Sequence, residues 1–141
     1  MRLSFFLAPL RETLIPMTEN EIATTVVDAA YTIHTRLEPG LLESVYETTL
    51  AYELTKRGLT VRRQQAMPVV YESVRMDIGF RADLIVADKV IVEIKSIEAV
   101  SPVHRKQLLT YLRLTDKRLG LLINFNVELI KGGLTRVVNN L

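Results

Sequence analysis

One segment restricts the possible folds of this chain more than any other: the almost wholly apolar run LGLLINF, residues 119–125. Such a run is typical of a β-strand buried on both faces, because a strand with one wet face alternates apolar and polar residues. A strand of this kind pairs in parallel with a neighbour, and parallel pairing needs a crossover connection. Ser101-Pro102 supplies an N-cap and a first-turn proline for a crossover helix. We therefore predict a helix over about 102–115, followed by a buried parallel strand.

Two more helices are predicted near the start of the chain. The segment Thr18 to Glu21 has the form of a capping box, and the apolar stripe that follows it continues to the break at Glu38-Pro39-Gly40. A second periodic run ends at Lys56-Arg57-Gly58, with cations in the last turn and glycine after it. These patterns predict helices over about 18–37 and 41–57.

The remaining segments are typical of strands. Short branched or aromatic runs bounded by turn residues lie between Gly58 and Ser96, and they predict three or four antiparallel strands. At the end of the chain, Val127 to Ile130 and Leu134 to Val138 flank Lys131-Gly132-Gly133, which predicts a terminal hairpin. The order of these elements predicts an α/β sandwich, with a mixed central sheet flanked by helices.

Length and composition fit one globular domain. The chain has 141 residues, 48% hydrophobic and 24% charged, which is close to the average for folded domains and excludes a disordered protein. We predict a single domain over 18–141, preceded by a loosely ordered extension over 1–17. The apolar run in that extension is too short to span a bilayer and resembles a signal peptide only in part. We therefore expect a cytoplasmic protein that does not contact a membrane.

Cysteine content and net charge exclude several kinds of functional site. The chain has no cysteine, which excludes disulfides, thiolate metal sites and a cysteine nucleophile. The net charge of +2 is too small for the broad basic surface that binds nucleic acid non-specifically, so phosphate contacts must be local. Basic groups of this kind more often belong to an ordinary solvated face. The candidates for nucleic-acid contact are Arg62, Arg63, Arg81, Arg105 and Tyr111.

The candidate chemistry lies in two adjacent strands, GFRADLIVADKVIVEIKS (79–96). Glu93 and Lys95 are two residues apart, so they project from the same face. Asp83 joins them only if the loop between the strands is 87–89, which places Asp83 opposite Glu93; a two-residue turn would put Asp83 on the other face. Facing carboxylates destabilise a sheet unless a cation lies between them.

Mg²⁺, or Mn²⁺ in its place, is the cation that such a pair favours, because hard divalent ions bind carboxylate, carbonyl and water oxygens. Asp83 and Glu93 would supply the carboxylates. Lys95 would orient or deprotonate the water and offset charge on a phosphate. The alternative is a salt-bridge cluster on a solvated strand face, and the spacing by itself does not decide between the two.

Two motifs in the sequence resemble those of known proteins. Asp83, followed by Glu93-Ile94-Lys95 at the end of a hydrophobic strand, resembles the D…(D/E)xK signature of the PD-(D/E)XK nuclease superfamily. GLLESVY (40–46) matches the G-x-x-E-x-x-Y string of the GxxExxY family within it, and the likeness covers about 18–140. Ala82 stands where the superfamily label has proline. The resemblance implies a PD-(D/E)XK nuclease-like fold and a metal-dependent hydrolase.

The resemblance also implies roles for residues outside the signature. The Ile94 carbonyl would be a third metal ligand. Glu43 would be the acidic residue of the helix before the sheet; its alternative is an exposed helix glutamate. Tyr46 either fixes the rotamer of Glu43 or is a core residue. Gln107 and Tyr111 form a Q-x-x-x-Y motif one helical turn apart, and Gln107 would need a partner if it were buried. We expect Glu43 and Gln107 to approach the carboxylates.

The primary hypothesis is a Mg²⁺-dependent phosphodiesterase that hydrolyses nucleic acid with a metal-activated water. Its rival is a nuclease-fold module that binds nucleic acid or a protein partner without cutting. A homodimer would let two sites act on two strands. DNA and RNA, single and double strands, and internal and terminal cleavage all remain open at this level.

Overall fold

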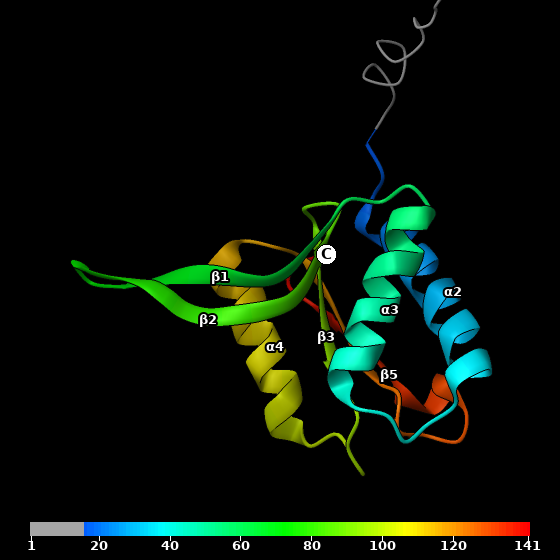
Figure 1. Cartoon of the computed structure of the whole chain (residues 1–141). Helices are drawn as coiled ribbons and strands as arrows, with labels where there is room; N and C mark the ends of the chain where they lie inside the picture. Colours follow the sequence, from blue (N-terminus) through cyan, green and yellow to red (C-terminus); the bar gives the residue numbers. More distant parts are fainter. Residues whose placement is uncertain (1–15) are drawn as a thin grey trace, which may run out of the picture.

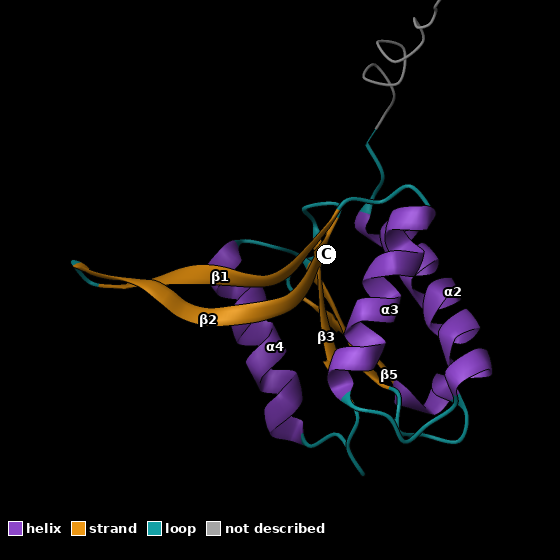
Figure 2. Ribbon diagram, viewed as in Figure 1, coloured by secondary structure: helices purple, strands orange, loops and turns teal. Residues whose placement is uncertain are grey.

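The computed structural model describes residues 16–141, so most of the predicted extension, residues 1–15, lies outside the described residues. Three long helices pack on a five-stranded mixed sheet, as Figures 1 and 2 show. The helices are α2 (Glu19–Leu37), α3 (Glu43–Lys56) and α4 (Pro102–Thr115); the strands are β1 (Val61–Tyr71), β2 (Val74–Val86), β3 (Val90–Lys95), β4 (Leu119–Asn124) and β5 (Leu134–Val138).

Two of the predicted helices, α2 and α4, begin at their capping residues, whereas α3 begins after Leu42 without a side-chain cap. Thr18 Oγ1 accepts a hydrogen bond from the backbone N–H of Glu21, and the Glu21 carboxylate accepts one from the Thr18 N–H. At the start of α4 the backbone N–H of Ser101 donates to Nδ1 of His104, which assigns this histidine to a helix cap. None of the helices within residues 16–141 is long and apolar enough to cross a membrane.

The sheet has the order β1-β2-β3-β4-β5, and only the β3–β4 pair is parallel. The predicted parallel pairing of the apolar run is therefore confirmed, with α4 as the crossover. The three-residue loop between β2 and β3 is confirmed as well, because Val86 pairs with Val90 and Leu84 pairs with Val92. This register sets the position of the candidate site.

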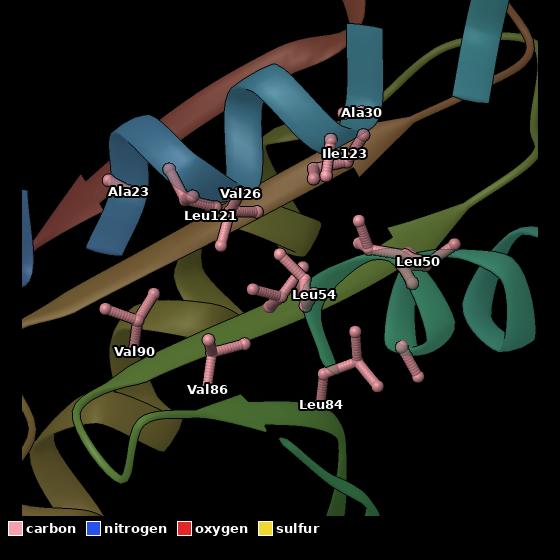
Figure 3. Close-up of a cluster of buried hydrophobic side chains, with 14 of the residues drawn as sticks. Ala23, Val26, Ala30, Leu50, Leu54, Leu84, Val86, Val90, Leu121 and Ile123 are labelled. Carbon is pink, nitrogen blue, oxygen red and sulfur yellow. The ribbon is translucent and has the colours of Figure 1, made fainter. Parts of the chain in front are cut away.

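The core lies in two layers, one on each face of the sheet. Figure 3 shows the larger layer, in which α2 and α3 cover Val90, Leu121 and Ile123. On the other face, Leu108 and Leu112 of α4 pack over the sheet. Helices therefore flank a mixed sheet on both sides, which confirms the predicted α/β sandwich.

The predicted terminal hairpin is wrong. The segment 127–129 forms no strand, η1 (Ile130–Gly133) is a short 3-10 helix, and β5 pairs with β4 instead. The reason lies in the tertiary packing: Ile130 is buried in the larger core layer, and its segment reaches that position as the 3-10 helix η1 instead of extending beside β5.

The hairpin of β1 and β2 extends far beyond the rest of the sheet. β1 and β2 remain paired out to Tyr71 and Val74, whereas β2 pairs with β3 only from Leu84 onward. We call residues 66–81 the arm. Figure 1 shows the arm, in green, projecting from the body of the molecule. The candidate site lies at the base of the arm.

Candidate active site

Asp83 and Glu93 meet at the point where β2 and β3 stop pairing. The backbone N–H of Asp83 donates to Glu93 Oε2 at 2.9 Å, and the backbone N–H of Ile94 donates to Asp83 Oδ2 at 2.9 Å. The regular ladder between the strands ends one pair earlier, at Leu84 and Val92. Side-chain carboxylates thus bind backbone donors next to the end of the ladder, and this holds both carboxylates in fixed positions.

The electrostatics of the pair are those of a site that needs positive charge. Glu93 is only 6% exposed, and burial together with the nearby Asp83 charge raises the pKa of Glu93 to about 8. The N–H of Asp83 and the charge of Lys95 act in the opposite direction and do not compensate for these effects. A second positive charge at this position would favour the ionised form of both carboxylates.

The groups around the pair fit a hard divalent cation. Two carboxylates are present, and the Ile94 carbonyl points to the same edge of β3 as its N–H, which Asp83 accepts. Lys95 is two residues beyond Glu93 and projects from the same face of β3. Within residues 16–141 no three acidic or histidine side chains form a ready-made cage. Hard divalent cations can bind through one or two carboxylates and complete their shell with water and phosphate oxygens.

Two residues at the site were not predicted. Glu47 of α3 is buried, and its charge also raises the pKa of Glu93. The Gln64 side-chain amide bridges this glutamate and the strand pair: Nε2 donates to Glu47 Oε1 at 2.6 Å and to Asp83 Oδ1 at 3.1 Å. A sequence signal existed for Glu47, because it follows Glu43 by four residues and shares its helix face. Gln64 stands in a polar stretch of β1 and gives no such signal.

The backbone of Gln64 is in an unusual conformation. Its φ is +48°, a region that residues other than glycine rarely adopt. Its ladder neighbours, Arg63 and Gln65, pair with Leu84 and Ala82, so Gln64 lies opposite Asp83. Strain of this kind persists where the surrounding contacts hold it, and here the two carboxylate acceptors of the amide hold it.

The GxxExxY string connects α3 to the end of β3. Glu43 is exposed, and its Oε2 accepts the backbone N–H of Ser96 at 3.2 Å, while Ser96 Oγ donates to the Leu41 carbonyl at 2.6 Å. Tyr46 is fully buried, its hydroxyl donates to the Glu38 carbonyl at 2.6 Å, and its ring stacks on Phe125. Tyr46 is therefore a core residue that braces the turn before α3. Glu43 reaches the residue after Lys95 but does not contact the carboxylate pair.

The Q-x-x-x-Y motif reaches the site through its tyrosine. Tyr111 stacks on Phe80 with ring centroids 3.9 Å apart. Its pKa is raised, first by burial and then by the charges of Glu93 and Asp83. Gln107 hydrogen-bonds to Tyr111, which acts in the opposite direction on that pKa. Gln107 itself is exposed, so the condition under which it would need a buried partner does not hold: α4 turns this position away from the core.

The basic candidates separate into three groups. Arg62 forms an ion pair with Asp88 at the loop between β2 and β3, at the opposite end of β3 from Lys95. Arg63 is bound to Glu47 at 3.2 Å beside the site. The remaining two, Arg81 at the base of the arm and Arg105 on α4, are exposed and form no ion pair within the described part of the chain.

Comparison with known families agrees with this geometry. A model of the PD-(D/E)XK nuclease superfamily matches residues 20–137. This segment holds the three helices and the five strands, except the first residue of α2 and the last residue of β5. It also holds Asp83, Glu93 and Lys95. Searches of curated proteins and of solved structures found no match. Since the matched segment is most of the chain, this protein belongs to the PD-(D/E)XK nuclease superfamily.

Proposed function

We propose that this protein is a divalent-metal-dependent nuclease of the GxxExxY family that hydrolyses phosphodiester bonds of nucleic acid. The observation that carries the proposal is the crossed pair of Asp83 and Glu93 with Lys95 on the same face of β3. A purely structural ion-pair cluster would place cations against both carboxylates. Here the only side-chain donor within hydrogen-bonding distance of Asp83 among the described residues is the neutral amide of Gln64.

Asp83, Glu93 and the Ile94 carbonyl would hold Mg²⁺ or Mn²⁺. The ion, when bound, supplies positive charge for the scissile phosphate and lowers the pKa of a water molecule. Lys95 positions the attacking water and donates to a phosphate oxygen as negative charge develops there. Tyr111 of α4 would contact the nucleic acid beside the carboxylates, whose charges raise the pKa of its hydroxyl.

Glu43, Glu47 and Gln64 would act as positioning residues. Gln64 holds the rotamers of Asp83 and Glu47 through one amide. Glu43 binds the backbone immediately after Lys95, so it holds the end of β3 in place. Accurate placement of this kind matters because a shift of about 1 Å at a reacting centre costs roughly a hundredfold in rate.

The test is cleavage by the purified protein. Labelled single- and double-stranded DNA and RNA are incubated with Mg²⁺, with Mn²⁺ or with chelator, next to an Asp83→Asn preparation made in parallel. We expect cleavage that requires the divalent ion and is absent from the variant. Binding of the same substrates without cleavage by either protein would reject the nuclease and support a non-cutting nucleic-acid module. Equal cleavage by both preparations would indicate a contaminating enzyme.

A further inference from the structure

The arm is two strands wide, and among the described residues α4 covers only its base, where Tyr111 stacks on Phe80. Within residues 16–141, β2 has no partner strand on its β3 side between Val74 and Ala82, and β1 is the outer strand of the sheet. Figure 1 shows both strands extending past the body of the molecule. An isolated two-stranded hairpin is at best marginally stable in water, and independent stability needs at least three strands. An arm of this length therefore indicates a partner that adds strands to it.

The two open edges of the arm are not equivalent. β1 contains Pro68, which lacks a backbone N–H and blunts that edge against pairing. β2 contains no proline along its open edge. Tyr71 and Val74 close a two-residue hairpin, and such a closing pair exchanges its hydrogen bonds within the hairpin. The backbone groups of Arg75 therefore point to the open edge of β2. Between Met76, which pairs with Val69, and Phe80, which pairs with Met67, β2 holds two extra residues, an even number that keeps Asp77 in the same alternation.

That edge is self-complementary. Its sequence, Val74-Arg75-Met76-Asp77-Ile78, is symmetric in character about the methionine, with apolar residues at both ends and one charge of each sign between. The apolar members are 57%, 38% and 57% exposed in chain order. The side chains of Arg75 and Asp77 are 62% and 87% exposed. Their ion pair within one chain, at 3.0 Å, is a surface pair of the kind that contributes little stability.

We propose that the partner is a second copy of this chain, and that the two β2 strands pair antiparallel around a two-fold axis at Met76. In that register Arg75 of each copy lies opposite Asp77 of the other copy, and Val74 of each copy lies opposite Ile78 of the other copy. Both are favourable cross-strand pairs. The two arms then form one four-stranded antiparallel sheet. This inference does not depend on the nuclease activity.

Nucleic acid fits the same edge less well. Binding to a phosphate backbone needs an excess of positive charge, whereas the central segment carries one cation and one anion that cancel. The exposed apolar residues at alternate positions also form no hydrogen bond or ion pair with a phosphate group. A matching strand satisfies the open backbone groups, the charges and the apolar side chains together.

Charge reversal tests the proposed register. The mass in solution is measured by light scattering over a concentration series for wild type, Arg75→Asp, Asp77→Arg and the double variant, with Lys131→Asp on η1 as an exposed control. We expect the wild type, the control and the double variant to reach twice the 16.0 kDa chain mass. Each single variant should stay monomeric, because it places like charges opposite each other.

Mixing the two single variants separates pairing from an effect within one chain. In the mixture each reversed residue faces an opposite charge on the other variant, so we expect a dimer to form. Loss of the ion pair inside the monomer predicts no such rescue. A wild type that is monomeric at every concentration, or single variants that dimerise as well as wild type, would overturn the proposal.

Cross-linking tests the position of the axis without altering a charge. The chain has no cysteine, so a Met76→Cys variant carries a single thiol per copy. Residues in a non-hydrogen-bonded antiparallel pair have Cα atoms about 4.5 Å apart, within the range that a disulfide spans. We expect this variant to form a covalent dimer on mild oxidation. The matched Ile78→Cys variant should not, because its two copies would be about 14 Å apart along the strands. The reverse pattern would contradict the register.

Discussion

The carboxylates of Asp83 and Glu93 each accept a hydrogen bond from the backbone of the other residue's strand. The N–H of Asp83 donates to the Glu93 carboxylate, and the N–H of Ile94 donates to the Asp83 carboxylate. The exchange places two anionic groups side by side next to the last regular ladder pair. The backbone donors stabilise the individual carboxylates but leave their mutual repulsion in place. This relationship explains why the site calls for a cation.

Replacing Asp83 by asparagine should abolish metal-dependent cleavage without weakening the fold. The substitution removes one of the two metal-binding charges and also the repulsion on Glu93, so the metal-free variant should be as stable as wild type or slightly more stable. Isothermal calorimetry with Mn²⁺ and a urea melt measure the two effects. Asp88→Asn is the matched control, since Asp88 is an exposed carboxylate in the loop at the other end of β3. Normal metal binding by Asp83→Asn would contradict the ligand assignment.

Replacing Lys95 by alanine should separate binding from catalysis. Both carboxylates remain, so the divalent ion should still bind in calorimetry. The cleavage rate should fall by roughly 10²–10⁴, the loss expected for a positioned proton-transfer group. Lys89→Ala is the control, because Lys89 lies in the loop before β3 and donates to the Met17 carbonyl. The Lys89→Ala variant should cleave at the wild-type rate. A rate unchanged by Lys95→Ala would remove Lys95 from the mechanism.

The metal-free protein should lose stability as the pH rises from about 4.5 to about 8. The folded pKa of Glu93, about 8, lies above its ordinary value of 4.5, so the folded state retains a proton over this window that the unfolded state has lost. Thermal melts across the window measure the slope. Glu93→Gln should flatten it, because the variant has no carboxyl at this position to titrate. Mg²⁺ added to the wild-type protein near pH 8 should restore the stability that the metal-free protein loses as the pH rises. An equal slope in the variant would show that another group is responsible.

Two substitutions at Gln64 should differ in their effect on stability. Both remove the amide that donates to Glu47 and Asp83, so both should lower the free energy of unfolding. Glycine adopts a φ of +48° without strain whereas valine is branched at Cβ, so Gln64→Val should be less stable than Gln64→Gly by about 1–2 kcal/mol. Urea titration of both variants gives the comparison. The same free energy for the two would indicate that the backbone relaxes at this position.

Removing the hydroxyl of Tyr46 should destabilise the protein by about 1–3 kcal/mol. The hydroxyl donates to the Glu38 carbonyl and accepts the Leu41 N–H, and Tyr46→Phe leaves both of these backbone groups without a partner. Tyr52→Phe, on an exposed position of the same helix, should change nothing. Chemical denaturation measures both. Full stability of Tyr46→Phe would mean that the turn before α3 does not depend on this hydroxyl.

Much of this structure follows from local patterns. Capping residues and apolar periodicity act within one or two helical turns, so the start of α2 and both ends of α4 could be predicted closely. The register of Asp83 against Glu93 also depends on a local quantity, the length of the loop between their strands. One apolar run was enough to predict a parallel pairing, because both of its faces had to be buried.

The rest depends on how distant elements pack. Glu47 and Gln64 belong to the site because β2 and β3 separate beside α3, and no local pattern contains that separation. The segment before β5 forms η1 rather than a strand, because Ile130 is buried in a core that distant elements build. The orientation of Gln107 is set by the way α4 lies on the sheet. Residues whose charges act on one another need not be close in sequence. Folding brings them to one site, so the sequence alone does not show which residues will meet there.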